Sequence, residues 1–106
     1  MMRPFASITA VESVTIEDDV SIASLSTVTD ATHDVATTAG SAETLAAAPV
    51  RIGRGTGIAQ RVAVLAGSNV GQHCYIEANS IVSGDIPDCS IATGIPARVV
   101  GETRER

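Results

Sequence analysis

The fold is decided by residues 52–82, which read IGRGTGIAQRVAVLAGSNVGQHCYIEANSIV. Within this stretch a branched aliphatic residue, here called an anchor, returns at every sixth position without a miss. A small or compact side chain stands four residues after each of the first five anchors. The stretch is therefore a hexapeptide repeat, with anchors at Ile52, Ile58, Val64, Val70, Ile76 and Val82 and compact residues at Thr56, Val62, Ser68, Cys74 and Ser80.

A period of six indicates extended chain, because six is a multiple of the two-residue period of a strand and does not match the helical period of 3.6. Three hexads per coil of about 18 residues would stack the anchors in columns, as in a parallel β-helix. Such a narrow core has little room for rings, and the chain is 44% hydrophobic with one Phe, one Tyr and no Trp. Chance patterning in a chain rich in Ala, Val and Ile would not also place a compact residue four positions after each of the first five anchors. The sequence thus predicts an all-β protein.

Charge and composition argue against several classes of function. The chain of 106 residues is long enough for one hydrophobic core, and seven basic residues, all arginine, stand against twelve acidic ones for a net charge of -5. No basic stripe is available to neutralise phosphates, so we expect no nucleic-acid partner. No apolar run has the length of a signal peptide core or membrane span, so we expect no membrane partner and a cytoplasmic location. The two cysteines predict neither a disulfide framework nor a metal site.

Breaks in the repeat divide the chain into segments. Residues 1–7 carry no periodicity and form a lead-in, and residues 8–87 are expected to form the β-helix. Pro87 cannot donate to a strand ladder, so we expect the pairing to end there. Residues 88–106 are then predicted to be a C-terminal capping tail.

Residues 29–49 interrupt the β-helix. Their anchor positions fall on Asp34, Gly40 and Ala46, which cannot fill an aliphatic column. The segment must therefore loop out of the coil, and we call it the excursion. Loops that project from a rigid scaffold are where binding and catalytic residues concentrate.

The excursion contains a candidate general base, His33. A neutral imidazole can take a proton from a hydroxyl group near neutral pH. A single loop histidine is, on its own, more often a solvated bystander than a catalytic residue. The other histidine, His73, falls in the middle of a hexad and is expected on the surface.

Several motifs in fixed order resemble the C-terminal portion of the maltose/galactoside O-acetyltransferase group of hexapeptide-repeat acyltransferases. The resemblance covers residues 8 to 100, and the spacing from the histidine to the Pro-x-x-Ile-Gly motif is similar to that of the family. It implies a left-handed parallel β-helix. The residues that carry it are Val14-Thr15-Ile16, Val20, Ile22-Ala23, Thr32-His33, Pro49-Val50-Arg51-Ile52-Gly53, the hexads, Asp85-Ile86-Pro87 and Gly94-Ile95-Pro96-Ala97-Arg98-Val99.

The resemblance also implies a homotrimer with acetyl-CoA, the donor substrate, in each cleft between neighbouring subunits. His33 would be the general base on a hydroxyl of a sugar or similar small acceptor, with no metal. A backbone N–H near Ala59 and Gln60 would stabilise the oxyanion. Ala78 and Ser83 would contact the pantetheine arm, and Arg98 the nucleotide end, where a guanidinium suits a phosphate.

Three departures from the family pattern favour an alternative. Gly57 stands where the family has an aromatic residue, Gly84 where it has a lysine, and Ala10-Val11 where it has an acidic pair. The alternative is a truncated, non-catalytic trimeric β-helix module, in which the alanines are small only because the coil demands it.

A third interpretation is a metal-dependent hexapeptide protein of the carbonic-anhydrase kind. It would need three histidines to hold the metal. The chain contains two, His33 and His73. This interpretation is therefore disfavoured.

Overall fold

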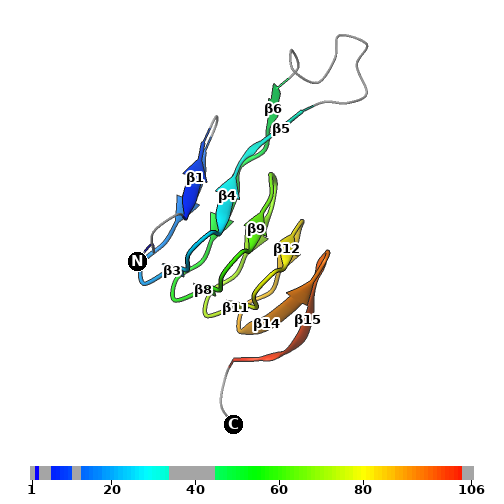
Figure 1. The fold of residues 1–106 in the computed structure, drawn as a ribbon. Coiled ribbons are helices and arrows are strands. Elements are labelled where there is room, and N and C mark those ends of the chain that lie inside the picture. Colours follow the sequence, from blue (N-terminus) through cyan, green and yellow to red (C-terminus); the bar gives the residue numbers. More distant parts are fainter. Residues whose placement is uncertain (1, 3–5, 11–12, 34–44, 104–106) are drawn as a thin grey trace.

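The computed structural model describes residues 2, 6–10, 13–33 and 45–103, and the chain there winds as a coil with three flat sides (Figure 1). On each side, successive coils add one short strand to a parallel ladder, and in one of the three sheets a final strand is then added in antiparallel fashion. Sheet 1 contains β1 (Ser7–Thr9), β4 (Thr27–Thr29), β9 (Ala63–Val64) and β12 (Ile81–Val82). Sheet 2 contains β2 (Val14–Ile16), β7 (Val50–Ile52), β10 (Asn69–Val70) and β13 (Asp85–Ile86). Sheet 3 contains β3 (Ser21–Ile22), β8 (Gly57–Ile58), β11 (Tyr75–Ile76), β14 (Ser90–Gly94) and β15 (Ala97–Glu102).

The anchors stack in columns, as the repeat predicts. Ile58 pairs with Ile76, and Val64 pairs with Val82, each one coil apart. Every anchor from Ile52 to Val82 is at most 2% exposed. Burying β-branched side chains in a continuous column is the main favourable term for a solenoid of this kind.

The compact positions of the repeat lie at the corners and are buried as well. Their hydroxyl groups satisfy backbone carbonyls of the turning chain: Thr56 Oγ1 donates to Gly71 O over 2.7 Å, and Ser68 Oγ donates to Val82 O over 3.1 Å. A buried carbonyl without a partner would be costly. The repeat therefore requires small side chains here for their size and, at several corners, for a hydroxyl.

The excursion leaves the coil at the corner between sheet 1 and sheet 2, here called corner 1–2 (Figure 1). Its two ends form an antiparallel ribbon of β5 (Ala31–His33) and β6 (Leu45–Ala47), in which His33 is opposite Leu45. Ala46 belongs to this ribbon, whereas Asp34 and Gly40 lie outside the described residues. Val28 still pairs with Val64 on the next coil, so the ladder of sheet 1 is unbroken.

Parallel pairing continues beyond Pro87, which differs from the prediction that it ends there. β14 adds to β11 in parallel, with Ile76 opposite Ala92. Pro87 is exposed and lies between β13 and β14, at a corner where no ladder hydrogen bond is required of it. After β14 the chain turns back, and β15 pairs with it in antiparallel fashion. In the part of the chain that is described, no helix is long and apolar enough to cross a membrane.

Candidate functional site

Three of the predicted site residues lie together at the corner between sheet 3 and sheet 1, here called corner 3–1. Ala59 and Gln60 follow β8, and Ala78 follows β11 on the next coil. The two turns are in direct contact, because the Asn79 N–H donates to the Gln60 carbonyl over 3.0 Å. Gln60 and Ala78 are exposed, while Ala59 is half-buried. Residues eighteen positions apart thus form one column on the outside of the coil.

The backbone amides of this corner are not equivalent. The Ala59 N–H donates to the Ile76 carbonyl over 3.0 Å and is used by the ladder of sheet 3. The Gln60 N–H has no hydrogen-bond partner among the described residues. Of the two positions predicted to supply an oxyanion donor, Gln60 is therefore the one with an amide available for a ligand.

Arg98 lies on the last coil of the same side of the molecule. It is exposed on β15, opposite Thr93 of β14. β14 is in turn linked to the turn that contains Ala78, because the Gly94 N–H donates to Ser80 Oγ over 3.1 Å. From Gln60 through Ala78 to Arg98, the predicted residues thus descend one coil at a time.

Ser83 and His33 lie elsewhere. Ser83 is exposed at corner 1–2, between β12 and β13, and His33 is in the ribbon that leaves the same corner. The side chain of His33 is outside the described part of the chain. Apart from Arg98 on β15, one chain by itself therefore divides the predicted residues between two corners, with the outer face of sheet 1 between them.

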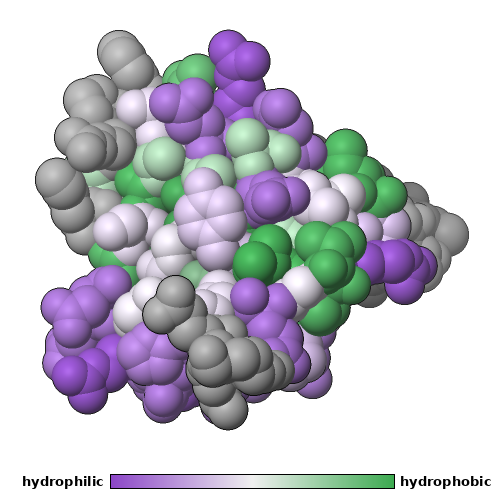
Figure 2. Space-filling model, turned by 90° about the horizontal axis from the view of Figure 1, so that it is seen from below, coloured by the Kyte–Doolittle hydropathy of each residue, from purple (hydrophilic) through white to green (hydrophobic). Residues whose placement is uncertain are grey.

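A pocket of about 250 Å³ opens on the outer face of sheet 3 and extends to corner 3–1. Its walls come from three coils, and the described side chains that line it carry no charge. Figure 2, which views the molecule from below, shows hydrophobic groups exposed between hydrophilic ones. The side chain of Tyr75 in the pocket wall is itself 45% exposed. The lining residues are Ser21, Ile22, Ala23, Gly57, Ile58, Ala59 and Tyr75.

The floor of the pocket is shaped by small residues in strict register. Ser21, Gly57 and Tyr75 are neighbours across β3, β8 and β11. A Cβ atom at position 57 would lie 3.1 Å from Tyr75 Cδ1, so the tyrosine ring leans over the glycine. Gly57 is one of the departures from the family pattern, whereas Tyr75 was not among the residues predicted from the sequence. The signal was available, because residue 75 lies one 18-residue coil after residue 57.

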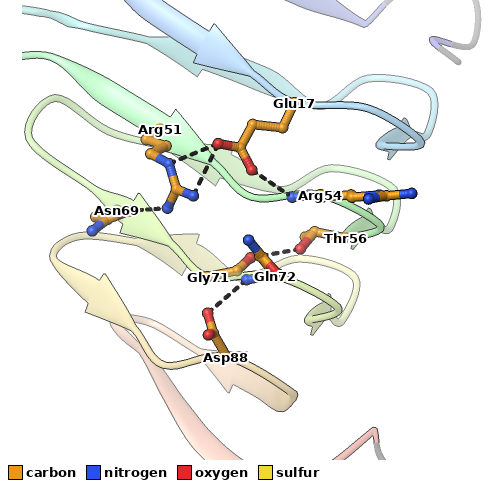
Figure 3. Close-up of polar contacts among 8 residues, drawn as sticks. All are labelled: Glu17, Arg51, Arg54, Thr56, Asn69, Gly71, Gln72 and Asp88. Carbon is orange, nitrogen blue, oxygen red and sulfur yellow. Dashed lines mark hydrogen bonds and ion pairs between the residues drawn. The ribbon is translucent and has the colours of Figure 1, made fainter.

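The outer face of sheet 2 is charged and polar, in contrast to the uncharged pocket on sheet 3. Arg51 on β7 forms an ion pair with Glu17, with 2.9 Å between Nη2 and Oε2, and its Nη1 donates to Asn69 Oδ1 over 3.3 Å (Figure 3). Charged and amide side chains therefore cover this side of the coil. The small and apolar side chains lie on sheet 3, where the pocket is.

Metal and thiol chemistry have no support in the described part of the chain. No group of three or more His, Cys, Asp and Glu side chains among the described residues could hold a metal ion. Cys74 is buried in the core, and burial raises the pKa of its thiol above the ordinary value. A buried neutral thiol is a poor nucleophile. His73 is exposed, as predicted.

No family model matches the chain. The similar proteins described next are all acetyltransferases. The putative lipopolysaccharide biosynthesis O-acetyltransferase WbbJ of Escherichia coli is 32% identical over 108 residues, covering 93% of this chain and 55% of that protein. A solved galactoside acetyltransferase in complex with coenzyme A has a TM-score of 0.81 and 30% identity, covering 93% of this chain and 54% of that one. A hexapeptide-repeat acetyltransferase of Vibrio cholerae, solved with acetyl coenzyme A, has a TM-score of 0.80 and 21% identity, covering 99% and 68%.

The chain spans about half the length of the Escherichia coli relative, since 55% of that protein is covered. The fold predicted from the hexads and the resemblance is confirmed by the three parallel sheets together with these similarities. It is an all-β, left-handed parallel β-helix built from hexapeptide repeats.

Proposed function

The chain is homologous to hexapeptide-repeat O-acetyltransferases, and from this premise we propose that it moves an acetyl group from acetyl-CoA to a hydroxyl of a sugar or similar small acceptor. The observation that supports this best is the column of Gln60, Ala78 and Arg98 on successive coils, which ends beside the pocket on sheet 3. An extended donor with a charged end and an uncharged end suits a site of this shape.

In the proposed reaction the chain's own residues supply a base and an electrostatic contact. His33 accepts the proton of the acceptor hydroxyl while the oxygen of that hydroxyl attacks the thioester carbonyl carbon. The Gln60 N–H donates to the carbonyl oxygen as negative charge develops there, a contact whose loss typically lowers kcat by about 10²–10³. The C–S bond then breaks, and the sulfur of CoA takes the proton from His33.

Arg98 and Ala78 position the donor in this proposal. Arg98, exposed on β15, pairs with a phosphate at the nucleotide end through charge-assisted hydrogen bonds. Ala78 lets the pantetheine arm lie close to the backbone of the turn after β11. Ser83 contacts the same arm from corner 1–2.

The division of the site between two corners supports a homotrimer as part of the proposal. Corner 3–1 carries Gln60 and Ala78, whereas corner 1–2 carries Ser83 and the ribbon with His33. In a threefold assembly, corner 3–1 of one subunit can face corner 1–2 of the next. A donor bound in that cleft would meet both sets of residues. A cytoplasmic location belongs to the same proposal, because the donor is available there.

A second candidate function is the non-catalytic trimeric module. It is favoured by Gly84, at corner 1–2, because a glycine offers no cation at that position. A module of this kind would trimerise but would bind no acetyl-CoA.

The test is calorimetric binding of acetyl-CoA to the full chain, with the solution mass measured alongside, followed by a screen of sugar acceptors for release of free CoA thiol. We expect one site per subunit of a trimer. His33→Ala should retain binding and lower kcat by about 10²–10⁴, the usual contribution of a general base. A folded trimer without acetyl-CoA binding would exclude the enzyme and favour the module. Unchanged acetyl transfer by His33→Ala would exclude the base assignment alone.

A further inference from the structure

The floor of the pocket on sheet 3 includes Gly57, where a Cβ atom would already meet the ring of Tyr75 at 3.1 Å. Gly57 precedes the buried anchor Ile58, so any other residue there would project outward into the pocket. The φ angle of Gly57 is not in the left-handed region, so the backbone does not require glycine at this position. The glycine at residue 57 therefore affects the shape of the outer surface of the sheet and not the conformation of the backbone.

The pocket is much larger than an acetyl group requires. Its volume is about 250 Å³, whereas one water molecule, similar in size to a methyl group, takes about 30 Å³ in the liquid. Ala23, Ala59 and the edge of the Tyr75 ring give it an apolar lining. Among the described lining residues, only Ser21 and Tyr75 carry hydroxyl groups. Such a lining suits a hydrocarbon chain better than a sugar, which needs several polar partners.

The position of the pocket relative to the proposed donor site indicates which part of the donor would occupy the pocket. Arg98 is on the last coil, Ala78 one coil earlier, and Gln60 one coil earlier again. A donor whose phosphates meet Arg98 and whose carbonyl oxygen meets the Gln60 N–H directs its acyl group away from Arg98. Ala59, the residue next to Gln60, is part of the pocket wall.

We propose that the pocket on sheet 3 receives the acyl chain of the donor, so that the protein also binds and transfers linear acyl groups longer than acetyl. Gly57 is the residue that determines this specificity, and Tyr75 forms one wall. The inference rests on the proposed function, because it takes the thioester carbonyl to lie at Gln60. The reaction is unchanged: the C–S bond of the acyl-CoA breaks and an ester C–O bond forms.

The test compares the binding of CoA, acetyl-CoA, butyryl-CoA and hexanoyl-CoA to the full chain by calorimetry, which needs no acceptor. We expect the affinity to rise by roughly two- to fourfold for each methylene group added beyond acetyl, the effect of burying a methylene in a half-open apolar site. Gly57→Leu should remove this gain, lowering the affinity for hexanoyl-CoA by about tenfold or more, and should leave the affinity for CoA itself unchanged.

Two further variants complete the test. Ser21→Leu fills the pocket from β3 and should have the same effect if Gly57→Leu fails to fold. Thr15→Leu is the matched control: Thr15 is exposed and precedes the anchor Ile16 on sheet 2, as Ser21 precedes Ile22 on sheet 3. It should bind every donor like the unsubstituted chain.

The outcomes separate the two proposals. If CoA and acetyl-CoA bind but the affinity does not depend on chain length, the acyl pocket is wrong and the proposed function stands. If Gly57→Leu and Ser21→Leu weaken all four ligands equally, the acyl assignment is also wrong. If none of the four ligands binds to the folded, unsubstituted chain, the proposed function fails, and the acyl pocket fails with it.

Discussion

Arg51 and Glu17 form an ion pair between two coils that the excursion separates in the sequence. Nε and Nη2 of Arg51 lie 3.1 and 2.9 Å from Oε2 of Glu17, and the other carboxylate oxygen, Oε1, accepts the N–H of Arg54 over 3.0 Å (Figure 3). Both carboxylate oxygens thus bind the coil that follows the excursion. The pair helps to hold the first coil in register with the second although its members are 34 positions apart in the sequence.

Glu17→Gln should therefore reduce stability modestly. The pair is partly exposed, with side chains 40% and 32% accessible, so solvent screens it. We expect a loss of about 0.5–1 kcal/mol in the free energy of unfolding, measured by urea denaturation, and a smaller loss at high salt. Asp85→Asn, on the exposed side of the same sheet, is the control and should change stability less. Equal losses in the two variants would show that the pair does not secure the register.

Ile76→Ala should destabilise the fold strongly. Ile76 is fully buried in the column between Ile58 and Ala92. Removing a buried isoleucine side chain costs the transfer free energy and leaves a cavity, together about 2–5 kcal/mol. Val100→Ala, at a valine that is 61% exposed, should cost less than about 0.5 kcal/mol. Urea unfolding of both variants measures the difference, and a small effect of Ile76→Ala would mean that the column repacks.

Arg98→Ala should weaken binding of acetyl-CoA about tenfold to a hundredfold, the effect of losing hydrogen bonds between charged groups. Calorimetry at two salt concentrations checks this, since the unsubstituted chain should lose more affinity than the variant when salt is raised. Arg54→Ala is the matched control, because it removes the same charge from the turn between sheet 2 and sheet 3. If both variants bind alike, Arg98 has no specific contact with the donor.

Cys74 should make stability fall in alkaline solution. Burial raises the pKa of its thiol in the folded chain, so the unfolded chain, in which the thiol ionises near pH 8.5, loses its proton first. The unfolded state then binds fewer protons, and the free energy of unfolding decreases as pH rises above about 8.5 towards the pKa of the folded state. Urea unfolding between neutral and alkaline pH should show a shallower decrease for Cys74→Ala. Parallel profiles for the two proteins would contradict the prediction.

Much of the candidate site follows from the repeat itself. Residues eighteen positions apart share a column, so Ala59 and Ala78, nineteen apart, could be expected on neighbouring turns. Tyr75 could have been placed beside Gly57 by the same rule. The choice between the amides of Ala59 and Gln60 could not, because it depends on which N–H the ladder of sheet 3 uses.

The sequence by itself determined the β-helix, because a six-residue period leaves extended coils with buried anchors as the arrangement that keeps Ile52 to Val82 out of water. Only the tertiary structure decided what surrounds the columns. It carried the ladder past Pro87 through β14, separated Ser83 from Ala78 by placing them at different corners, and opened a pocket over Gly57. These features depend on contacts between coils. A periodic pattern predicts which residues point inward, but it does not predict what the outward-pointing residues contact.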